Sequence, residues 1–479
     1  MISVVDSNFI GAIGVLLNLT HGPSAASITW LNPTRSNSAM RTMLTMAALA
    51  AATALGLTAC SHLAPGAPAE AAPLAAACPK DVPSGAQCWR GVDSAKAPYL
   101  LIMPAQWSGV LVVHAHGGPS LGEPKSSRND EDAARWAISV KAGHAWAASA
   151  FRQGGVEVRS AAEDTERVRR IFVQHVARPK TTLLHGQSWG AGVAAKAAEM
   201  APASWDGVLL SSGVLAGGSN SYDFRLDLRV VYQYLCANHR RADEADYPLW
   251  MGLPADSKLS RAELATRVDA CLGVRKPAAQ RTPEQAVRLK TIVDVIRIPE
   301  RSVLAHLNWA TWHFQDISMH RTGGGNPFDN QRVRYTGSAD DAALNAAVLR
   351  YRADPAAAAR FAADTDPSGD IRVPVLTVHG IQDPTAFVEM DHHFRQVMES
   401  AGRGANLVQT FVRSDQHSYL GDATYPPLFD ALLAWVTRGE KPTPASVAAR
   451  CEAGIARWGV CSYDSAFTPA PLETRVYPR

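Results

Sequence analysis

Short apolar runs alternate with amphipathic segments along the chain after residue 108. The runs are short enough to be strands that are buried on both faces, and the segments between them carry apolar residues at helical spacing. The candidate strands span residues 109–118, 145–151, 181–186 and 206–214, and the candidate helices span residues 130–144, 161–177 and 190–201. This alternation predicts a mostly parallel sheet flanked by helices, which is an α/β fold.

The alternation stops after residue 215 and returns near residue 371. Residues 216–370 hold helical segments, several tryptophans and several prolines, but no clear buried strand, which predicts an inserted helical cap. The pattern resumes with candidate strands at 373–380 and 407–413. Candidate helices follow them at 386–402 and 426–439. The sequence therefore predicts a core formed by residues 78–215 and 371–479, the second part ending in a C-terminal extension.

Composition excludes one class of partner. The 47 basic and 44 acidic residues are scattered along the chain, and the formal net charge is +3. Nucleic-acid binding requires a basic stripe or patch, which this distribution lacks, so we expect no nucleic-acid partner. An apolar content of 47% in 479 residues is sufficient for a full core.

Residues 40–60 are typical of an export signal. Arg41 precedes an apolar stretch that is too short for a membrane span, and small residues precede Cys60. The segment 57–60, Leu-Thr-Ala-Cys, resembles the bacterial lipobox, in which the cysteine is lipidated and becomes the mature N-terminus. Ser61, rather than aspartate, follows it, which resembles sorting to the outer membrane. A plain secretory peptide that is cut within 67–72 is the alternative.

These features predict an exported protein with a lipid anchor. We expect residues 1–39 to be a spurious extension, residues 61–77 to be a tether, and Cys60 to attach the protein to the bacterial cell envelope. Without the lipid, the same signal predicts a periplasmic or secreted protein.

Six cysteines remain after Cys60, an even number that suits disulfide formation in an oxidising compartment. Six cysteines allow 15 connectivities. Near neighbours close short loops, so the expected pairs are Cys78 with Cys88, Cys236 with Cys271, and Cys451 with Cys461. The sequence has no C-x-x-C pair and no H-E-x-x-H helix, so we expect no metal and no organic cofactor.

A glycine-flanked serine, Gly186-Gln187-Ser188-Trp189-Gly190, stands where a candidate strand gives way to a candidate helix. A serine hydroxyl is a poor nucleophile at neutral pH and needs a neighbouring imidazole to take its proton. A strand-turn-helix setting exposes such a serine, and glycines allow the turn to be tight. Ser188 is therefore the candidate nucleophile, and a glycine-rich bend without chemistry is the alternative.

An acid and a base follow in the order that such a serine requires. Asp383 ends the strand-like run 373–383 at the carboxyl edge of the predicted sheet, and His417 lies in a loop after the next run. The chain order Ser, Asp, His is that of the α/β-hydrolase arrangement of the triad. The competing residues are Asp366, Asp370 and Asp391 for the acid and His392 and His393 for the base.

Backbone N–H groups must also stabilise the oxyanion that forms during acyl transfer. The glycine loop at 116–119, His-Gly-Gly-Pro, follows a candidate strand. We expect the N–H of Trp189 and that of Gly118 or Gly117 to form the oxyanion hole.

Together these motifs resemble the α/β-hydrolase superfamily over roughly residues 85–440, with the cap as the least similar part. The segments 116–119 and 188–190 are similar to the HGGP and SWG motifs of prolyl iminopeptidases, which also have a helical cap. Those enzymes bind the substrate's free amine through cap glutamates, one of which closes a Trp-x-x-Trp-Glu segment. In residues 309–313, Trp-Ala-Thr-Trp-His, His313 stands where that glutamate would be.

A second branch is the group of exported bacterial carboxylic-ester hydrolases. The segments 328–330, 417–422 and 432–443 and the cysteine-bearing start before the sheet are similar to this group. The resemblance implies ester hydrolysis, and an aromatic-rich cap suits a mostly apolar pocket for a hydrophobic acyl or aryl group. The candidate substrate-binding residues are Trp309, Trp312, His313, Phe314 and Arg152, the last as a partner for a substrate carboxylate.

The sequence thus predicts a serine hydrolase that cleaves carboxylic esters through a Ser-His-Asp triad and an acyl-enzyme. An aminopeptidase of the prolyl-iminopeptidase type is the first alternative, and a non-catalytic lipid-anchored binding protein is the second. The expected partners are a small or oligomeric ester and, through Cys60, a membrane. Nothing in the sequence indicates an oligomeric state.

Overall fold

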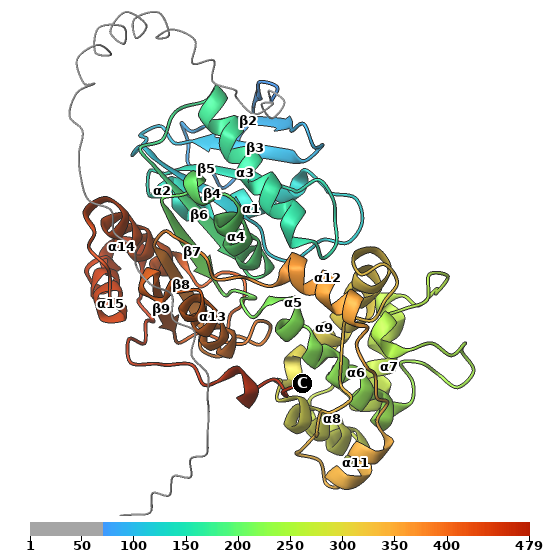
Figure 1. The fold of residues 1–479 in the computed structure, drawn as a ribbon. Helices are drawn as coiled ribbons and strands as arrows, with labels where there is room; N and C mark the ends of the chain where they lie inside the picture. The colour runs from blue at the N-terminus through green and yellow to red at the C-terminus, as the bar shows by residue number, and fades with distance from the viewer. Residues whose placement is uncertain (1–69) are drawn as a thin grey trace, which may run out of the picture. The chain divides into compact units, whose positions relative to one another are not determined.

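A nine-stranded sheet organises residues 70–479, the part of the chain that the structure describes (Figure 1). The structure is a computed structural model. The strands are β1 (Leu74–Ala76), β2 (Gln87–Val92), β3 (Pro98–Met103), β4 (Val110–Ala115), β5 (Ala145–Ser149), β6 (Thr181–Gln187), β7 (Gly207–Ser211), β8 (Val375–Gly380) and β9 (Leu407–Val412). The signal, lipidation and start-site predictions fall on residues 1–69, outside the described residues.

The strand order is β1-β2-β3-β5-β4-β6-β7-β8-β9. β3 runs antiparallel to β2 and to β5, β1 runs antiparallel to β2, and every pairing from β5 to β9 is parallel. This is the α/β-hydrolase fold. The predicted fold class is confirmed, and the three antiparallel strands at one edge are an addition that the sequence pattern did not reveal.

Helices cover both faces of the sheet because side chains alternate along each strand. Leu111 and Val113 of β4 pack with the helices of one face, and Val110 and Val112 pack with those of the other. The first face carries α3 (Val158–His175), α4 (Trp189–Met200) and α13 (Glu389–Ser400). The second carries α1 (Ser127–Arg135), α2 (Ala137–Lys141), α14 (Tyr425–Arg438) and α15 (Pro444–Ala453), and α16 (Ile455–Trp458) follows α15.

Residues 212–374, all described by the structure, hold helices and no strand between β7 and β8. These cap helices are α5 (Gly217–Ser221), α6 (Asp223–Cys236), α7 (Arg261–Leu272), α8 (Pro283–Ile296), α9 (Val303–Asn308), α10 (Phe314–Asp316), α11 (Asp341–Ala347) and α12 (Pro355–Thr365). Two π-helical turns, Trp309–His313 and Ile317–Arg321, flank α10. The cap has its own hydrophobic cluster, which includes Leu226, Phe314 and Phe328.

Local signals in the sequence set where several cap helices begin. Thr282 and Gln285 form a reciprocal capping box at the start of α8, with Pro283 at the first helical position. The Asp354 side chain accepts from the N–H groups of Ala356 and Ala357 at the start of α12. These caps satisfy N–H groups that a helix start leaves unpaired.

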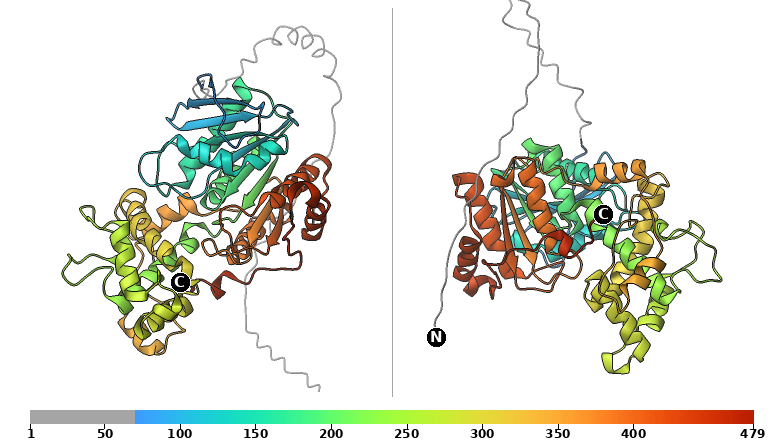
Figure 2. Two further views of the ribbon diagram at one scale, coloured as in Figure 1. Left: turned by 180° about the vertical axis from the view of Figure 1, so that it is seen from behind. Right: turned by 60° about the horizontal axis from the view of Figure 1, so that its bottom comes forward.

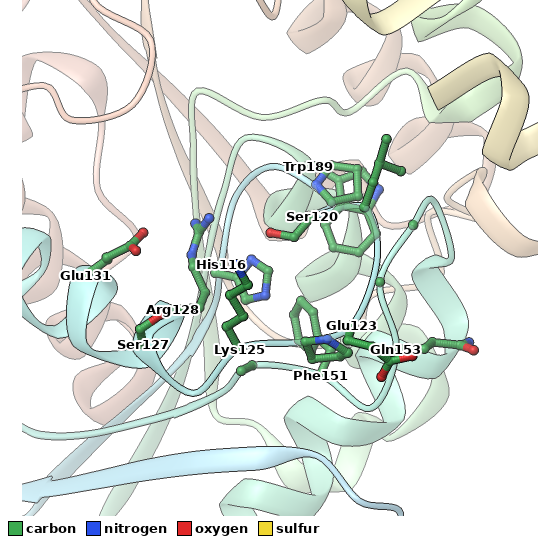
Figure 3. A pocket seen from close by; sticks show the side chains of 16 residues that line it. His116, Ser120, Glu123, Lys125, Ser127, Arg128, Glu131, Phe151, Gln153 and Trp189 are labelled. Carbon is green, nitrogen blue, oxygen red and sulfur yellow. The ribbon is translucent and has the colours of Figure 1, made fainter. Parts of the chain in front are cut away.

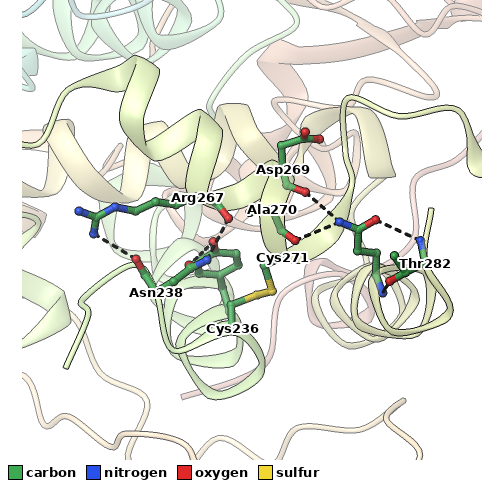
Figure 4. The surroundings of a disulfide bond; sticks show 9 residues. Cys236, Asn238, Arg267, Asp269, Ala270, Cys271 and Thr282 are labelled. Atoms are coloured by element: carbon green, nitrogen blue, oxygen red, sulfur yellow. Dashed lines mark hydrogen bonds between the residues drawn. A yellow bond between two sulfur atoms is a disulfide. The ribbon is translucent and has the colours of Figure 1, made fainter. Parts of the chain in front are cut away.

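All three predicted disulfides are present: Cys78–Cys88, Cys236–Cys271 and Cys451–Cys461. The Cys236–Cys271 bond joins the C-terminal end of α6 to α7 inside the cap (Figure 4). Asn238 adds to this junction, because its side-chain amide donates to the carbonyl oxygen of Arg267 at 2.9 Å. Three disulfides are typical of a protein from an oxidising compartment.

The predicted tether of residues 61–77 is wrong at its C-terminal end. β1 pairs with β2 through backbone hydrogen bonds, so residues 74–76 belong to the sheet. Glu70 is buried and accepts from the N–H and the hydroxyl of Ser94. The alanine-rich composition conceals this strand, because edge pairing uses main-chain groups that every residue carries.

The C-terminal segment after α16 runs from the sheet to the cap (Figure 2). Tyr463 forms a β-bridge with Val412 at the end of β9. Further along, the Tyr477 hydroxyl donates to Val295 O of α8 at 2.8 Å, and the Arg479 guanidinium pairs with Asp227 of α6 at 2.8 Å. The second part of the core therefore contacts the cap through its last residues.

Candidate active site

Ser188 occupies a strained turn between β6 and α4. Its backbone has φ 57° and ψ −124°, a conformation that non-glycine residues rarely adopt. A Cβ on Gly186 would lie 2.3 Å from Gly190 O, and a Cβ on Gly190 would lie 2.2 Å from Ala115 O. The two glycines are therefore required for the turn and for the close approach of α4 to β4.

The structure brings the three predicted triad residues together. Ser188 Oγ lies 2.7 Å from His417 Nε2, and His417 Nδ1 lies 2.8 Å from Asp383 Oδ2. The distances are those of direct hydrogen bonds. His417 and Asp383 lie in loops that follow β9 and β8, so the three groups meet at the carboxyl ends of parallel strands.

Four hydrogen-bond donors surround the Asp383 carboxylate. Oδ1 accepts from the N–H groups of Thr385 and Ala386 at 2.8 and 3.1 Å, while Oδ2 faces His417 and also His379 Nε2 at 3.3 Å. Burial alone would raise the pKa of Asp383, but the two imidazoles outweigh it and lower the pKa to about 2. The carboxylate therefore stays ionised, which is the state that can orient an imidazole and stabilise its cation.

His379 is a buried group behind this carboxylate. Its Nδ1 lies 2.6 Å from Asp391 Oδ2, and its Nε2 lies 2.9 Å from Ala386 O. Both ring nitrogens face acceptors, so the doubly protonated imidazolium satisfies them. Burial lowers the pKa of His379, but Asp391 and Asp383 raise it to about 10 overall. Asp391, a competitor for the acid in the sequence, thus pairs with His379 rather than with His417.

The other competing residues lie away from His417. His392 and His393 are on α13, as their helical setting in the sequence suggested. Asp366 accepts from the N–H of Ser219 at the start of the cap, and Asp370 pairs with Arg403.

The glycine loop after β4 lies against the nucleophile turn. A Cβ on Gly117 would lie 3.0 Å from Ser188 Cβ, and Gly118 has φ +67°, so both positions favour glycine. Arg128 Nη2 donates to Gly117 O at 2.7 Å and thereby anchors the loop to α1. Within residues 70–479, the N–H groups of Gly117, Gly118 and Trp189 donate no hydrogen bond to another protein group. They are free to bind an oxyanion.

A cavity of about 210 Å³ opens beside Trp189 (Figure 3). Aromatic rings of Trp189, His116 and Phe151 line one part of it, and His116 stacks on Phe151 with ring centroids 4.1 Å apart. The remaining wall includes four charged side chains: Glu123, Lys125, Arg128 and Glu131. The sequence predicted a mostly apolar, aromatic lining. This cavity also has charged lining residues, because α1 and the loop before it contribute them.

A second cavity, of about 380 Å³, is bounded by the cap. It shares Leu121, Glu123, Pro124, Gln153 and Gly154 with the first cavity, and the cap contributes Trp312, Gln315, Asp316, His320 and Arg321. Because the two cavities share five lining residues, they are adjacent, and together they extend from the nucleophile turn to the cap.

Three of the predicted substrate-binding residues lie where the cap meets the core. His313 Nε2 donates to Pro119 O in the glycine loop at 3.2 Å, and Trp309 stacks on His313 with centroids 3.8 Å apart. Trp312 lines the second cavity, with the Arg261 guanidinium 4.6 Å from its ring centroid.

The other two predicted substrate-binding residues are occupied elsewhere. Phe314 is buried and stacks on Phe328 with ring centroids 4.1 Å apart inside the cap. Arg152 borders the second cavity, but its guanidinium lies 2.6 Å from Asp164 Oδ1 and 2.9 Å from Glu163 Oε2. These two carboxylates already compensate its charge.

The sequence pattern missed two buried polar residues: His379, which lies beside Asp383, and Arg225, which lies beside Trp309 of the cap. His379 sits in an otherwise apolar strand, β8, where a histidine gives no periodic signal. Arg225 lies on α6 among charged residues that suggest a solvent-exposed face, yet it is only 2% exposed.

The described residues contain no group of three histidine, cysteine or acidic side chains placed to hold a metal ion. Among residues 70–479, no helix has the length and apolar content of a membrane span.

Comparisons with known proteins give similarity at the level of fold. No family model and no curated protein matches the sequence. Similar solved structures include feruloyl esterase B from Aspergillus oryzae, with 13% identity, a TM-score of 0.41, and coverage of 78% of this chain and 86% of that one. They also include the rice cell wall degrading esterase LipA from Xanthomonas oryzae, with 11% identity, a TM-score of 0.34, and coverage of 78% and 90%. A hormone-sensitive lipase from a metagenome library has 10% identity, a TM-score of 0.35, and coverage of 78% and 87%.

Proposed function

We propose that the protein is a serine hydrolase that cleaves carboxylic esters through an acyl-enzyme. The observation that carries this proposal is the continuous hydrogen-bonded series from Ser188 Oγ through His417 to Asp383, at 2.7 and 2.8 Å. The adjacent unpaired N–H groups of Trp189 and of Gly118 or Gly117 support it, because acyl transfer needs an oxyanion site beside the nucleophile.

The proposed reaction has two steps. His417 Nε2 takes the proton of Ser188 as Oγ attacks the ester carbonyl, and the oxyanion lies against the N–H groups of Trp189 and the glycine loop. The imidazolium, oriented by Asp383, then protonates the departing alcohol and leaves an acyl-serine. Water attacks this acyl group with His417 as base, and the carboxylic acid is released.

The cap favours an ester over the N-terminal peptide bond that an iminopeptidase cleaves. Such a peptidase needs a carboxylate for the substrate's ammonium, but His313 occupies that position and hydrogen-bonds to Pro119. The buried guanidinium of Arg225 lies against the neighbouring Trp309, with Cζ 5.0 Å from the ring centroid. The positive charge of Arg225 would repel a substrate ammonium bound near Trp309, so this part of the cap disfavours an N-terminal amine.

The test is covalent labelling followed by a comparison of substrates. A fluorophosphonate probe should label the wild type, and Ser188→Ala should abolish labelling and lower kcat for p-nitrophenyl butyrate by on the order of 10⁶-fold. Ser84→Ala, at an exposed turn serine, is the matched control and should label normally. Faster cleavage of a prolyl or alanyl p-nitroanilide than of the ester would favour the aminopeptidase. A wild type that neither labels nor hydrolyses would favour the binding protein.

We also infer that the mature protein is exported and carries a lipid on Cys60, which lies outside the described residues. The three disulfides support export. Expressed in a bacterium with an alkyne fatty acid, the full chain should incorporate the label and sediment with outer membranes. Cys60→Ser should lose the label, and a labelled Cys60→Ser protein would contradict the proposal.

A further inference from the structure

Arg225 is a buried cation for which the described part of the chain supplies no anion. It follows β7 on the first long cap helix, α6, and is 2% exposed. No carboxylate of residues 70–479 forms an ion pair with it, and its hydrogen bond within these residues runs from Nη1 to Ser221 O at 2.7 Å. Nε is buried without a partner in the same part of the chain.

Aromatic rings enclose the guanidinium. Its Cζ lies 4.6, 5.2 and 5.0 Å from the ring centroids of Phe224, Tyr222 and Trp309. Ring faces attract a cation but offer no hydrogen-bond acceptor in the guanidinium plane. Burial lowers the pKa of Arg225 to about 10, so the group is still charged at neutral pH.

Arg229, one turn further along α6, shows what a structural arginine looks like in the same surroundings. It is also fully buried and forms no ion pair with a carboxylate of residues 70–479. Its guanidinium, however, donates to the carbonyl oxygens of Leu249, Gly252 and Ala310 and contacts His239 Nδ1. Neutral acceptors therefore satisfy Arg229, whereas most donors of Arg225 remain open.

The part of the cap that packs beside Arg225 contacts both loops that carry the candidate catalytic groups. One face of the cap, which we call the cap roof, is formed by His306, Trp309 and His313. His306 Nε2 donates to Pro384 O beside Asp383 at 2.9 Å, and His313 Nε2 donates to Pro119 O in the glycine loop at 3.2 Å. The cap roof thus spans the two core loops on either side of the triad.

The rings that enclose Arg225 connect it to this roof. Phe224 contacts His306 edge-on at 5.0 Å between centroids, and Trp309 belongs to the roof itself. Burial lowers the pKa of His306 to about 3, and the charge of Arg225 adds to this effect. Phe224 thus contacts both Arg225 and His306, the roof residue that bonds to the loop of Asp383.

The roof offers no other charge to balance Arg225. Burial lowers the pKa values of His306 and His313 to about 3 and 4, so both are neutral at pH 7. Two nearby acids of α6, Asp223 and Asp227, pair with Arg479 at 3.1 and 2.8 Å. A buried charge without a partner is strongly unfavourable, and an anionic ligand would remove that penalty.

We propose that Arg225 binds a free carboxylate of the substrate. On the ester hydrolysis proposed above, this makes the substrate an ester whose acyl part or alcohol part carries a second, unesterified carboxylate. A carboxylate accepts two parallel N–H bonds from a guanidinium, which matches the open Nε and its neighbouring amino group. Arg225 then takes the role that the sequence had suggested for Arg152.

The test uses pairs of esters that differ only in this charge. For the alcohol side, 4-acetoxybenzoate is compared with 4-acetoxybenzamide, and for the acyl side, monomethyl adipate with methyl adipamate. Each kcat/KM is divided by the rate of hydroxide-catalysed hydrolysis of the same ester, which removes intrinsic reactivity. The wild type should prefer the carboxylate in one pair by about 10- to 100-fold, the range of a charge-assisted contact.

Variants of Arg225 and Arg229 distinguish direct binding of the substrate carboxylate from a general effect of buried positive charge. Arg225→Met should reduce the preference to near one, and Arg225→Lys should retain part of it. Arg229→Met removes an equal buried charge from the same helix and should keep the full preference. If a variant does not fold, protection of the wild type against fluorophosphonate by 4-hydroxybenzoate, but not by 4-hydroxybenzamide, tests the same contact.

Equal normalised kcat/KM values within both pairs, or an unchanged preference in Arg225→Met, would overturn the proposal while leaving the ester hydrolase in place. An equal loss on charged and neutral esters in Arg225→Met would also overturn it, because a structural role would have that effect. Failure of the esterase is distinct, since the wild type would then neither label nor hydrolyse any of the four compounds.

Discussion

The two sides of the active site differ in how their polar groups are satisfied. On the core side, both oxygens of the Asp383 carboxylate have protein donors, and Ser188 and His417 are paired with each other. On the cap side, Arg225 Nε, His306 Nδ1 and His313 Nδ1 are buried without partners among residues 70–479. The three triad groups are paired without a substrate, whereas these three cap atoms are not.

This difference suggests that the core groups serve the reaction itself and that the cap groups serve the choice of substrate. In the reaction proposed above, hydrogen bonds within the core would hold Ser188, His417 and Asp383 in position before a substrate arrives, which is the preorganisation that acyl transfer requires. Unpaired groups in the cap instead lower their free energy only when a ligand with matching donors or acceptors binds. We therefore expect core-side substitutions to lower kcat for every ester, and cap-side substitutions to change the ranking of esters.

The largest effect should come from Asp383→Asn. An amide cannot stabilise the imidazolium and allows the wrong tautomer of His417, so kcat should fall by on the order of 10⁴-fold for all four esters alike. Steady-state kinetics on the carboxylate and carboxamide pairs measure this. Asp391 is the next carboxylate, on the other side of His379. If kcat of Asp383→Asn falls by less than tenfold, Asp391 can act as the acid, and the hydrogen bonds around Asp383 are not what holds His417 in position.

The next largest effect should come from removing the imidazolium of His379, which lies behind Asp383, and it should appear in the stability of the fold. His379→Gln leaves Asp391 buried without its cation and should lower the free energy of unfolding by about 3–5 kcal/mol at pH 6.5. Chemical denaturation at fixed pH gives this value. Thr377 and Gln409 donate to Asp391 at 2.8 and 3.2 Å, so they can also bond to an amide at this position. The double variant His379→Gln/Asp391→Asn, which removes both charges of the pair, is therefore the matched variant and should lose less stability.

The same pair gives a pH dependence with a definite sign. The folded-state pKa of His379 is raised to about 10 from an unfolded value near 6.5. Its stabilisation is therefore complete below pH 6.5 and is lost as the pH rises toward 10. The difference in unfolding free energy between wild type and His379→Gln should shrink over this range. A difference that is constant from pH 6.5 to 10 would show that His379 is not charged in the folded protein.

The core side of the site could be predicted from the sequence. Six strands, β4 to β9, appeared as apolar runs, because strands buried on both faces have no polar alternation to obscure them. Ser188, Asp383 and His417 each follow such a run, and parallel strands place their carboxyl ends at one edge. Three side chains far apart in the chain could therefore be expected to meet.

The cap side could not be predicted in this way. The start of α6, Asp-Phe-Arg-Leu-Asp-Leu-Arg, has the composition of an exposed face, yet every one of these residues is buried. The partner of Asp223 and Asp227 is Arg479, more than 250 residues later, and no local pattern encodes such a pairing. Phe314, which is buried inside the cap, lies between two π-helical turns, whose extra residue has no sequence signature.

Loss of the cap disulfide should have the next largest effect on stability. Cys236 and Cys271 enclose a longer loop than Cys78 and Cys88, with separations of 35 and 10 residues. Loop-closure entropy predicts that the double variant Cys236→Ser/Cys271→Ser loses about 4 kcal/mol and Cys78→Ser/Cys88→Ser about 3 kcal/mol. Thermal unfolding would compare the two. Because the triad lies in the core, the cap variant should still label with fluorophosphonate at temperatures where the fold persists.

The smallest effect concerns the contact between the C-terminal segment and the cap. The Tyr477 hydroxyl donates to Val295 O at 2.8 Å and accepts from Thr336 N at 3.2 Å, so Tyr477→Phe should lower stability by about 1 kcal/mol. Tyr234→Phe, at a tyrosine that is 42% exposed, is the control and should change stability little. If the segment also positions the cap roof, Tyr477→Phe will reduce the preference for carboxylate esters, since Tyr477 packs in the same cluster as Phe224. A loss of stability without a change in preference would show that Arg225 is positioned by the rings around it rather than by this segment.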